Sequence, residues 1–116
     1  MVQLSLVLAA GGLLALVGAI FCIYWYIYYK RNFQGELLTE GPYAVVRHPF
    51  YTGFILLSLG LAIALPIYET RLLLVITLAV MYVYVPKEEK QMMQEYRKKY
   101  ADYKKKVPWR LIPYLY

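Results

Sequence analysis

The chain has 116 residues, of which 61% are hydrophobic, and a formal net charge of +6. With a mean hydropathy of +0.45, it is too apolar for an ordinary soluble domain of this length, so lipid must be part of its solvent. The single cysteine, Cys22, and the single histidine, His48, exclude an intrachain disulfide and a metal site built from several Cys and His ligands. We therefore expect one all-α integral membrane domain over residues 1–116, without a bound metal.

The first 29 residues carry no charged side chain. In a helix, at about 1.5 Å per residue, they exceed the roughly 30 Å hydrocarbon layer, which predicts a transmembrane helix over residues 3–29. Lys30 and Arg31 follow, and the aromatic residues just before them are typical of a helix end at the cytoplasmic interface. The amino terminus is therefore predicted to be extracytoplasmic and residue 30 to be cytoplasmic.

Small residues recur along this first span. Gly11, Ala15 and Ala19 follow one another every four residues, which predicts a smooth stripe on which another helix can pack closely. That helix belongs either to this chain or to a second copy. Because a chain of this length buries little surface by itself, a homo-oligomer is one expected arrangement.

Two further apolar segments follow a loop. Residues 32–47 mix Gly, Pro and charges and are typical of a surface loop. Pro49 suits the first turn of a helix, and the chain is then uncharged to Tyr68, which predicts a second span over residues 50–68. The third predicted span, 71–86, includes an uncharged stretch that reaches only about 22 Å. We favour a full crossing over a re-entrant hairpin, because Arg71 and Tyr68 can snorkel at one end.

The remaining residues, 87–116, form a basic tail. They hold nine of the thirteen basic residues and four of the seven acidic ones, which places the tail in the cytoplasm. Between residues 87 and 107, apolar and aromatic residues recur at three and four, the spacing of an amphipathic helix: Met92 or Met93, Tyr96, Tyr100, Tyr103 and Val107. We expect this helix to lie on the membrane or to fold back on the spans. Since its charges lie beside membrane spans, anionic lipid is the expected partner and nucleic acid is not.

Two clusters of polar residues lie next to the predicted spans. One is the segment GPYAVVRHPFYTG, residues 41–53, with Arg47 and His48; the other is the pair Glu88-Glu89. On pattern alone, the cations can simply mark a cytoplasmic flank, and the glutamates the acidic first turn of the tail helix. Alternatively, the two clusters neutralise one another or bind a ligand that carries both charges. S-adenosylmethionine is such a ligand.

The order of these pieces resembles a family of membrane methyltransferases. GPYAVVRHPFYTG is followed by a hydrophobic hairpin, by EE and by the tail pattern YxxYxxxVPxxxIP, over residues from about Leu38 to Pro113. This series resembles the family that includes isoprenylcysteine carboxyl methyltransferase and the phosphatidylethanolamine N-methyltransferases. The resemblance implies S-adenosylmethionine as methyl donor and a lipophilic acceptor taken from the bilayer.

The resemblance also implies which residues form the site, because the family uses its RHP-x-Y-x-G segment and its acidic pair to bind the nucleotide. The implied cofactor-binding residues are Tyr43, His48, Pro49, Tyr51, Gly53, Glu88, Glu89 and Tyr100. The implied catalytic residues are Arg47, His48, Glu88 and Arg110. Gly53 would let a ligand or a neighbouring helix approach the backbone, and the faces of Tyr43 and Tyr51 would attract the sulfonium.

Two features depart from the family pattern. The chain has Tyr96-Arg97 where relatives commonly have Phe-Gly, and its ending VPWRLIP replaces VPR followed shortly by IP. Arg110 would then be the displaced tail arginine. The chain is also shorter at its amino end than many relatives, so we expect either an incomplete acceptor pocket or one completed by a second subunit.

The identity of the acceptor stays open at this stage. Methylation of a prenylcysteine-type carboxylate is the leading expectation and would use a nearby cation such as Arg47 or Arg110. Methylation of a phospholipid amine is the alternative and would need a base such as Glu88 or His48. A function of another class, a non-catalytic membrane adaptor or lipid-binding protein, predicts that S-adenosylmethionine does not bind.

Overall fold

The computed structural model describes residues 2–116, and its regular elements are helices. Four α-helices follow one another, α1 (Val2–Asn32), α2 (Pro49–Ala64), α3 (Tyr68–Tyr96) and α4 (Lys98–Lys106), with a short 3-10 helix, η1 (Gly41–Ala44), between the first two. Residues 2–116 contain no strand. The predicted all-α class is confirmed.

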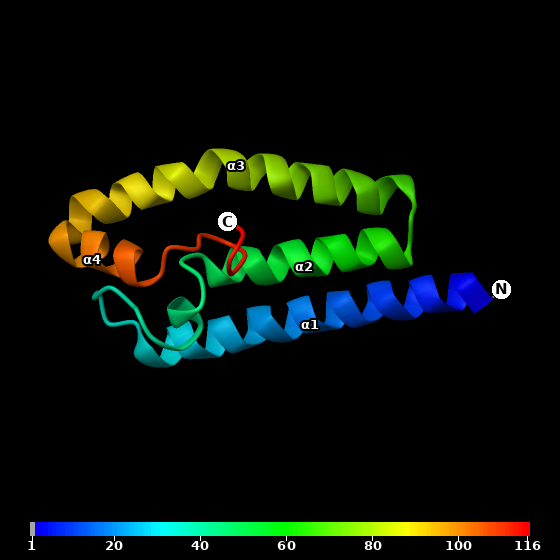
Figure 1. Cartoon of the computed structure of the whole chain (residues 1–116), viewed down its shortest axis with the longest axis horizontal. Helices are drawn as coiled ribbons and strands as arrows, with labels where there is room; N and C mark the ends of the chain where they lie inside the picture. The colour runs from blue at the N-terminus through cyan, green and yellow to red at the C-terminus, as the bar shows by residue number, and fades with distance from the viewer. Residues whose placement is uncertain (1) are drawn as a thin grey trace.

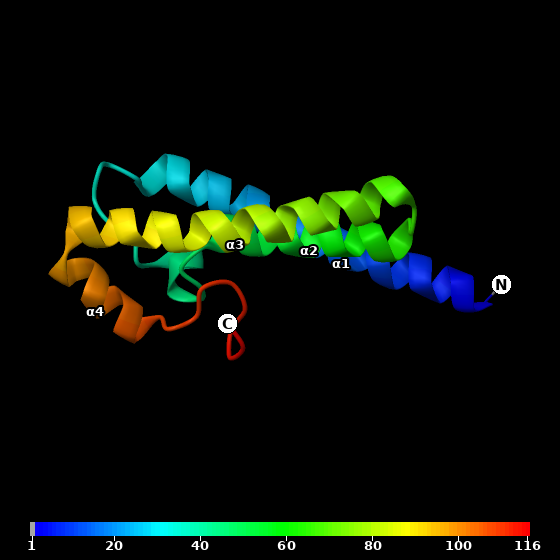
Figure 2. The ribbon, with the colours of Figure 1, turned by 90° about the horizontal axis from the view of Figure 1, so that it is seen from above.

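The helices are arranged so that the polar segments gather at one end. In Figure 1, α2 lies between α1 and α3, and the three run alternately along the long axis of the molecule. Helix α4, η1 and the loops around them lie at the end opposite to the start of α1, and the turned view in Figure 2 shows the same separation. The candidate site residues of the sequence therefore meet at one end of an apolar bundle.

Helices α1 and α2 approach each other closely because both carry glycine at the contact. A Cβ atom on Gly60 would lie 2.3 Å from the Ala15 backbone nitrogen, and one on Gly18 would lie 2.4 Å from that of Leu57. The packing prediction is confirmed at Gly11 and Ala15, and the partner is α2 of the same chain. Gly18 stands at the interface where a strict spacing of four predicted Ala19, because 3.6 residues per turn favour alternating steps of four and three.

The turn between α2 and α3 lies earlier in the chain than predicted. Helix α2 ends at Ala64, and Tyr68, the predicted end of the second span, begins α3. Thr70 stabilises this start, since its hydroxyl accepts the Ile67 backbone N–H at 3.3 Å and donates to the Leu65 carbonyl. Helix α3 then continues through Pro86, the predicted end of the third span, to Tyr96.

Packing explains why α3 passes through a proline. An interior proline costs a helix about 3 kcal/mol or more in an exposed setting. Here the buried residues Thr77, Met81, Val85 and Glu89 recur every four positions on both sides of Pro86. This stripe holds both halves of α3 against the rest of the bundle, which offsets the lost hydrogen bond.

Two helices are long and apolar enough to cross a membrane, over Gln3–Asn32 and Tyr68–Tyr96. The third apolar helix, α2, has 16 residues and reaches about 24 Å, less than the roughly 30 Å hydrocarbon layer. The short member of the hairpin is thus α2, whereas the sequence pattern indicated the segment 71–86. The structure supports α1 and α3 as membrane-spanning helices. A complete third crossing and the side of the membrane on which each terminus lies stay predictions.

The tail is bent rather than continuous. One amphipathic helix was expected over residues 87–107, but the chain turns at Arg97, whose φ of 50° is outside the helical region, and residues before it belong to α3. The predicted apolar stripe still comes together. Tyr100, Tyr103 and Val107 form a buried cluster, against which pack Leu37, Tyr43, Met92 and Tyr96.

Candidate active site

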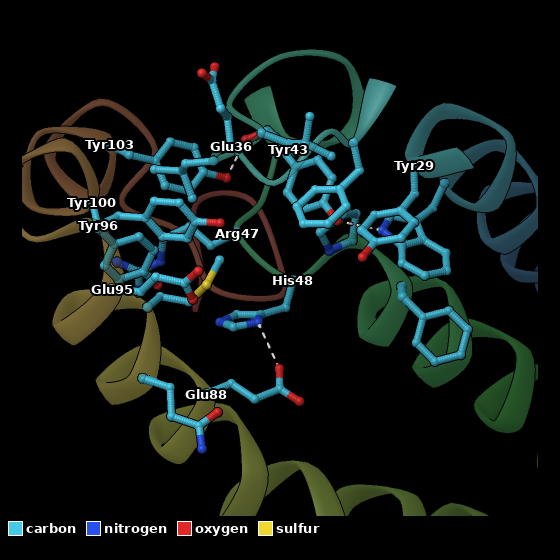
Figure 3. Close-up of a pocket in the computed structure, with 18 of the residues that line it drawn as sticks. Tyr29, Glu36, Tyr43, Arg47, His48, Glu88, Glu95, Tyr96, Tyr100 and Tyr103 are labelled. Atoms are coloured by element: carbon cyan, nitrogen blue, oxygen red, sulfur yellow. Dashed lines mark hydrogen bonds and ion pairs between the residues drawn. The ribbon is translucent and has the colours of Figure 1, made fainter. Parts of the chain in front are cut away.

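A pocket of about 540 Å³ lies at the polar end of the bundle, where the end of α1, the start of α2, the last turns of α3 and the helix α4 meet. Figure 3 shows tyrosines on two sides of this space and His48 between them, directed toward Glu88. The lining combines aromatic rings with charged groups. Its charged or titratable members other than tyrosine are Glu36, Arg47, His48, Glu88 and Glu95.

Glu89 is the centre of a group of ion pairs beside the pocket. Its Oε2 lies 2.8 Å from His48 Nε2 and 3.2 Å from Arg47 Nη2, and its Oε1 accepts from Arg110 Nε at 3.0 Å. The Glu89 and Arg47 side chains are only 6% and 7% exposed. Since a buried carboxylate needs cations and donors to offset its desolvation, this cluster ties α3 to the start of α2 and to the segment after α4.

Arg47 has a donor left over. Its Nη2 is paired with Glu89, but its Nε is buried and has no hydrogen-bond partner among the described residues. A buried N–H without an acceptor is costly, and such a group in a native protein calls for an explanation. Because Arg47 also lines the pocket, its guanidinium is a fixed cation that an anionic ligand group bound there would meet.

Glu88, unlike its neighbour Glu89, is partly exposed and lines the pocket. Its side chain is 41% exposed and lines the pocket, its Oε1 accepts from the Tyr51 hydroxyl, and its Oε2 lies 3.9 Å from His48 Nδ1. An ionised Glu89 can only accept, so His48 Nε2 carries a proton, and Nδ1 is the ring nitrogen nearer Glu88. Glu88 is therefore available to a ligand, whereas the Glu89 carboxylate already has three side-chain partners.

An aromatic wall closes the pocket on the α1 side. Three rings spaced by four stack in series, with centroids 5.3 Å and then 4.8 Å apart: Trp25 and Tyr29 at the end of α1, and Phe33 directly after it. Trp25 Nε1 donates to the Tyr43 hydroxyl at 2.7 Å, which orients the Tyr43 ring. From the sequence, the aromatic residues of this region indicated a membrane belt, although their spacing of four would also have indicated a common face.

The two tyrosines of α4 are neutral hydrogen-bond donors. The Tyr103 hydroxyl donates to the Tyr43 carbonyl at 2.6 Å, which fixes η1 against α4. Burial raises the pKa of Tyr103 and of Tyr100 above the usual value near 10, and the carboxylate of Glu89 raises that of Tyr100 further. Neither phenol can therefore act as a base near neutral pH.

The segment after α4 returns to the start of α2. The backbone N–H groups of Arg47 and His48 donate to the carbonyls of Trp109 and Arg110 at 2.9 and 3.0 Å, and Thr52 Oγ1 donates to the Leu111 carbonyl at 2.5 Å. These bonds hold residues 109–111 alongside residues 47–52. They place Arg110, 62 positions after His48 in the chain, on Glu89.

The structure divides the site residues expected from the sequence into two groups. Those that line the pocket are Tyr43, Arg47, His48, Pro49, Tyr51, Glu88 and Tyr100. Glu89 and Arg110 are in the ion-pair cluster beside it. Gly53 faces α1, where a Cβ would lie 2.6 Å from Cys22 Sγ, so the contacts favour the neighbouring-helix role over the ligand role.

Some lining residues were not expected from the sequence. Besides the aromatic residues at the end of α1, they include Glu36 from the loop before η1, and Glu95 and Tyr96 from the end of α3. Tyr96 fastens that loop, since its hydroxyl donates to the Gly35 carbonyl at 3.2 Å. No local pattern indicates this contact, because the two residues are 61 positions apart in the chain.

Comparison with known proteins identifies relatives of this chain. The family pattern of phospholipid methyltransferases matches residues 2–99. A protein-S-isoprenylcysteine O-methyltransferase of Schizosaccharomyces pombe is 36% identical over 80 residues, 68% of this chain and 34% of the relative. The Arabidopsis thaliana protein-S-isoprenylcysteine O-methyltransferase B is 32% identical over 81 residues, 68% of this chain and 41% of the relative.

The chain is also similar to a protein that is not named as a methyltransferase. A Delta(14)-sterol reductase of Mus musculus is 35% identical over 91 residues, 70% of this chain and 20% of the relative. The chain thus spans between a fifth and about two fifths of the length of these curated relatives. The match over residues 2–99 covers the three long helices and both polar clusters, and the chain belongs to the phospholipid methyltransferase family.

Proposed function

We propose that the chain is an S-adenosylmethionine-dependent methyltransferase that acts on a lipophilic acceptor. The observation that carries the proposal is Arg47, whose buried Nε has no partner among the described residues and which lines a pocket whose other fixed charges are carboxylates. A site of this kind suits a ligand with one anionic group and several cationic or donor groups. S-adenosylmethionine has a carboxylate, an ammonium, a sulfonium and a ribose diol, so the residues present fit it.

Each part of that ligand has a matching group in the pocket. The Arg47 guanidinium offers a cation to the carboxylate, and Glu88 offers an acceptor to the ammonium or the ribose hydroxyls. The faces of Tyr29, Tyr43 and Trp25 offer the negative π surface that attracts a sulfonium, as it attracts quaternary ammonium groups. A volume of about 540 Å³ is in the usual range for small-molecule sites.

Methyl transfer requires alignment of the acceptor with the methyl donor more than it requires acid or base groups. When bound, S-adenosylmethionine supplies an electrophilic methyl group: the acceptor lone pair forms the new bond while the methyl–sulfur bond breaks and its electron pair stays on sulfur. The chain then contributes by holding both reactants in line and by excluding water with its aromatic walls. The ion pairs of Glu89 keep His48 and Arg47 in fixed positions for this task.

Two classes of acceptor have separate support. The relatives from Schizosaccharomyces pombe and Arabidopsis thaliana are named for isoprenylcysteine O-methylation, which favours a carboxylate acceptor and requires no proton removal. The carboxylates Glu36, Glu88 and Glu95 in the pocket favour an amine, and His48 Nδ1 or Glu88 would take its proton. Methyl transfer from a labelled donor to a prenylcysteine analogue or to phosphatidylethanolamine, measured side by side, distinguishes them.

The first test is binding of S-adenosylmethionine to the detergent-solubilised protein by calorimetry. We expect saturable binding, and weaker binding of S-adenosylhomocysteine, because the demethylated compound lacks the charge that the aromatic faces attract. Absence of binding at millimolar ligand to a protein that is folded by circular dichroism would contradict the proposal. It would favour the adaptor function instead.

The variant Arg47→Lys tests the observation that carries the proposal. It keeps a cation near Glu89 but removes Nε, so we expect affinity for S-adenosylmethionine to fall roughly tenfold or more, the scale of a charge-assisted hydrogen bond. Arg71→Lys is the matched control, because Arg71 is exposed at the far end of α3. Equal affinity in both variants would remove Arg47 from the ligand site.

A further inference from the structure

Apolar side chains project from the segment that follows α4. Ile112, Tyr114 and Leu115 are 41%, 88% and 75% exposed, and Val45, on the loop that this segment meets, is 49% exposed. We call these four residues the segment patch. Contiguous exposed apolar surface of this kind usually marks an interaction site.

The depth of the segment patch follows from the length of α2. Helix α2 lies between α1 and α3, the two helices long enough to span a membrane (Figure 1), and it packs backbone to backbone against α1. Helix α2 ends at Ala64, level with the start of α3 at Tyr68. With α3 spanning the layer of roughly 30 Å from that point, α2 reaches only about 24 Å across it, so the first turn of α2 lies within the layer or at its boundary. Thr52 of that turn donates to the Leu111 carbonyl, which puts the segment patch at the boundary of the hydrocarbon.

Basic and aromatic residues border the segment patch. Lys105 and Lys106 end α4 directly before the segment and are exposed. Lys106 also lines a groove of about 360 Å³ with Val45, Trp109 and Tyr114. The rings of Trp109 and Tyr114 pack at 5.5 Å, as aromatic residues do at membrane interfaces. Cations beside apolar and aromatic surface match phosphates above acyl chains.

We propose that the segment patch is a lipid-docking surface, with its apolar side chains in the acyl region and with Lys105 and Lys106 on anionic headgroup phosphates. The proposal is independent of methyl transfer, because it concerns the outer face of the segment and not the pocket. It has a consequence for the site, since the same segment carries Arg110 to Glu89. Lipid contact thereby helps to hold the ion-pair cluster together.

The first experiment measures the depth of the patch in lipid nanodiscs. In a Cys22→Ala background, a fluorophore is attached at Leu115→Cys and quenched by lipids that carry a nitroxide at carbon 5 of the acyl chain. Leu16→Cys on α1 is the hydrocarbon control, and Lys99→Cys at the far end of the tail is the aqueous control; both are exposed in the structure. We expect quenching at position 115 to be at least half that at position 16. Quenching as weak as at position 99 would overturn the docking surface.

The second experiment tests the headgroup charge. Fluorescence at position 115 is quenched by headgroup-labelled anionic lipid or by a zwitterionic counterpart, with and without Lys105→Gln and Lys106→Gln together. We expect the preference for anionic lipid to fall roughly fivefold or more, since each lysine near the surface contributes on that scale. Lys98→Gln with Lys99→Gln is the control of equal charge. The charge assignment is overturned if both double variants behave alike, or if the parent protein shows no preference.

Discussion

Helices α1 and α3 flank α2 but are held to it by different physics. Along α1, glycines allow the two backbones to touch, and an aromatic contact between Trp25 and Phe50 lies near the end of the interface. Along α3, a stripe of spaced side chains ends in a buried carboxylate that is paired with Arg47, His48 and Arg110. In lipid, where burial of apolar surface gives helices little drive to associate, both solutions are used: close backbone approach and buried polar contacts. The contact between α1 and α2 is close along the backbones, whereas the polar contacts of α3 lie beside the pocket.

The sharpest way to break this contrast is Glu89→Gln. Removing the charge leaves Arg47 and Arg110 without their shared anion, and breaking a buried ion pair from one side costs about 3 to 5 kcal/mol. We expect a large fall in the free energy of unfolding, measured by denaturation in mixed micelles. Glu88→Gln is the matched control, since its amide oxygen still accepts from Tyr51. Equal losses in both variants would show that the ion-pair cluster does not hold α3.

The contact between α1 and α2 is tested by Gly60→Ala. The new methyl group would lie 2.3 Å from the Ala15 backbone nitrogen, so the helices must separate, at a cost of about 2 to 3 kcal/mol. Gly12→Ala adds the same methyl group to the same bundle where nothing lies within 4 Å. We expect a clear drop in melting temperature only for Gly60→Ala. Similar melting temperatures would contradict the close approach.

The two adjacent glutamates should separate ligand binding from stability. Glu88→Gln removes an exposed charge from the pocket lining, so it should weaken S-adenosylmethionine roughly tenfold, the usual scale for a hydrogen bond to a charged group, and leave the unfolding free energy within about 0.5 kcal/mol. Calorimetry and melting on the same preparation give both values. A stable variant with unchanged affinity would exclude Glu88 from the ligand site.

The smallest effect is expected for Tyr103→Phe, which removes the buried bond to the Tyr43 carbonyl and should cost about 1 kcal/mol. Tyr96→Phe, which removes an exposed bond, should cost less. The raised pKa of Tyr103 adds a signature in pH. Above about pH 10 the unfolded chain loses the phenolic proton before the folded one, so stability falls as pH rises there, and it should fall less in Tyr103→Phe. An identical alkaline profile would contradict a buried, protonated Tyr103.

Local pattern was enough for the apolar class of the chain, the first span and the identity of the polar clusters. Uncharged length indicates a membrane helix whatever surrounds it, and the series from Gly41 to Gly53 followed by Glu88-Glu89 carried the resemblance to a family that the comparisons confirm. The small-residue stripe was also predicted, apart from Ala19, because a close helix contact requires small side chains at helical spacing.

The roles within the polar clusters depended on tertiary structure. Glu88 and Glu89 are adjacent and chemically equal in sequence, but one helical step of about 100° turns the first toward the pocket and the second toward Arg47, His48 and Arg110. The bend at Arg97 and the continuation of α3 through Pro86 were likewise set by packing, which outweighs local propensity. The sequence by itself thus determined which groups are present and that the helices are apolar enough for a membrane, because these depend on composition and period. Only the fold decided which carboxylate faces a ligand and which is buried among cations, because that depends on the partners that residues far apart in the chain provide.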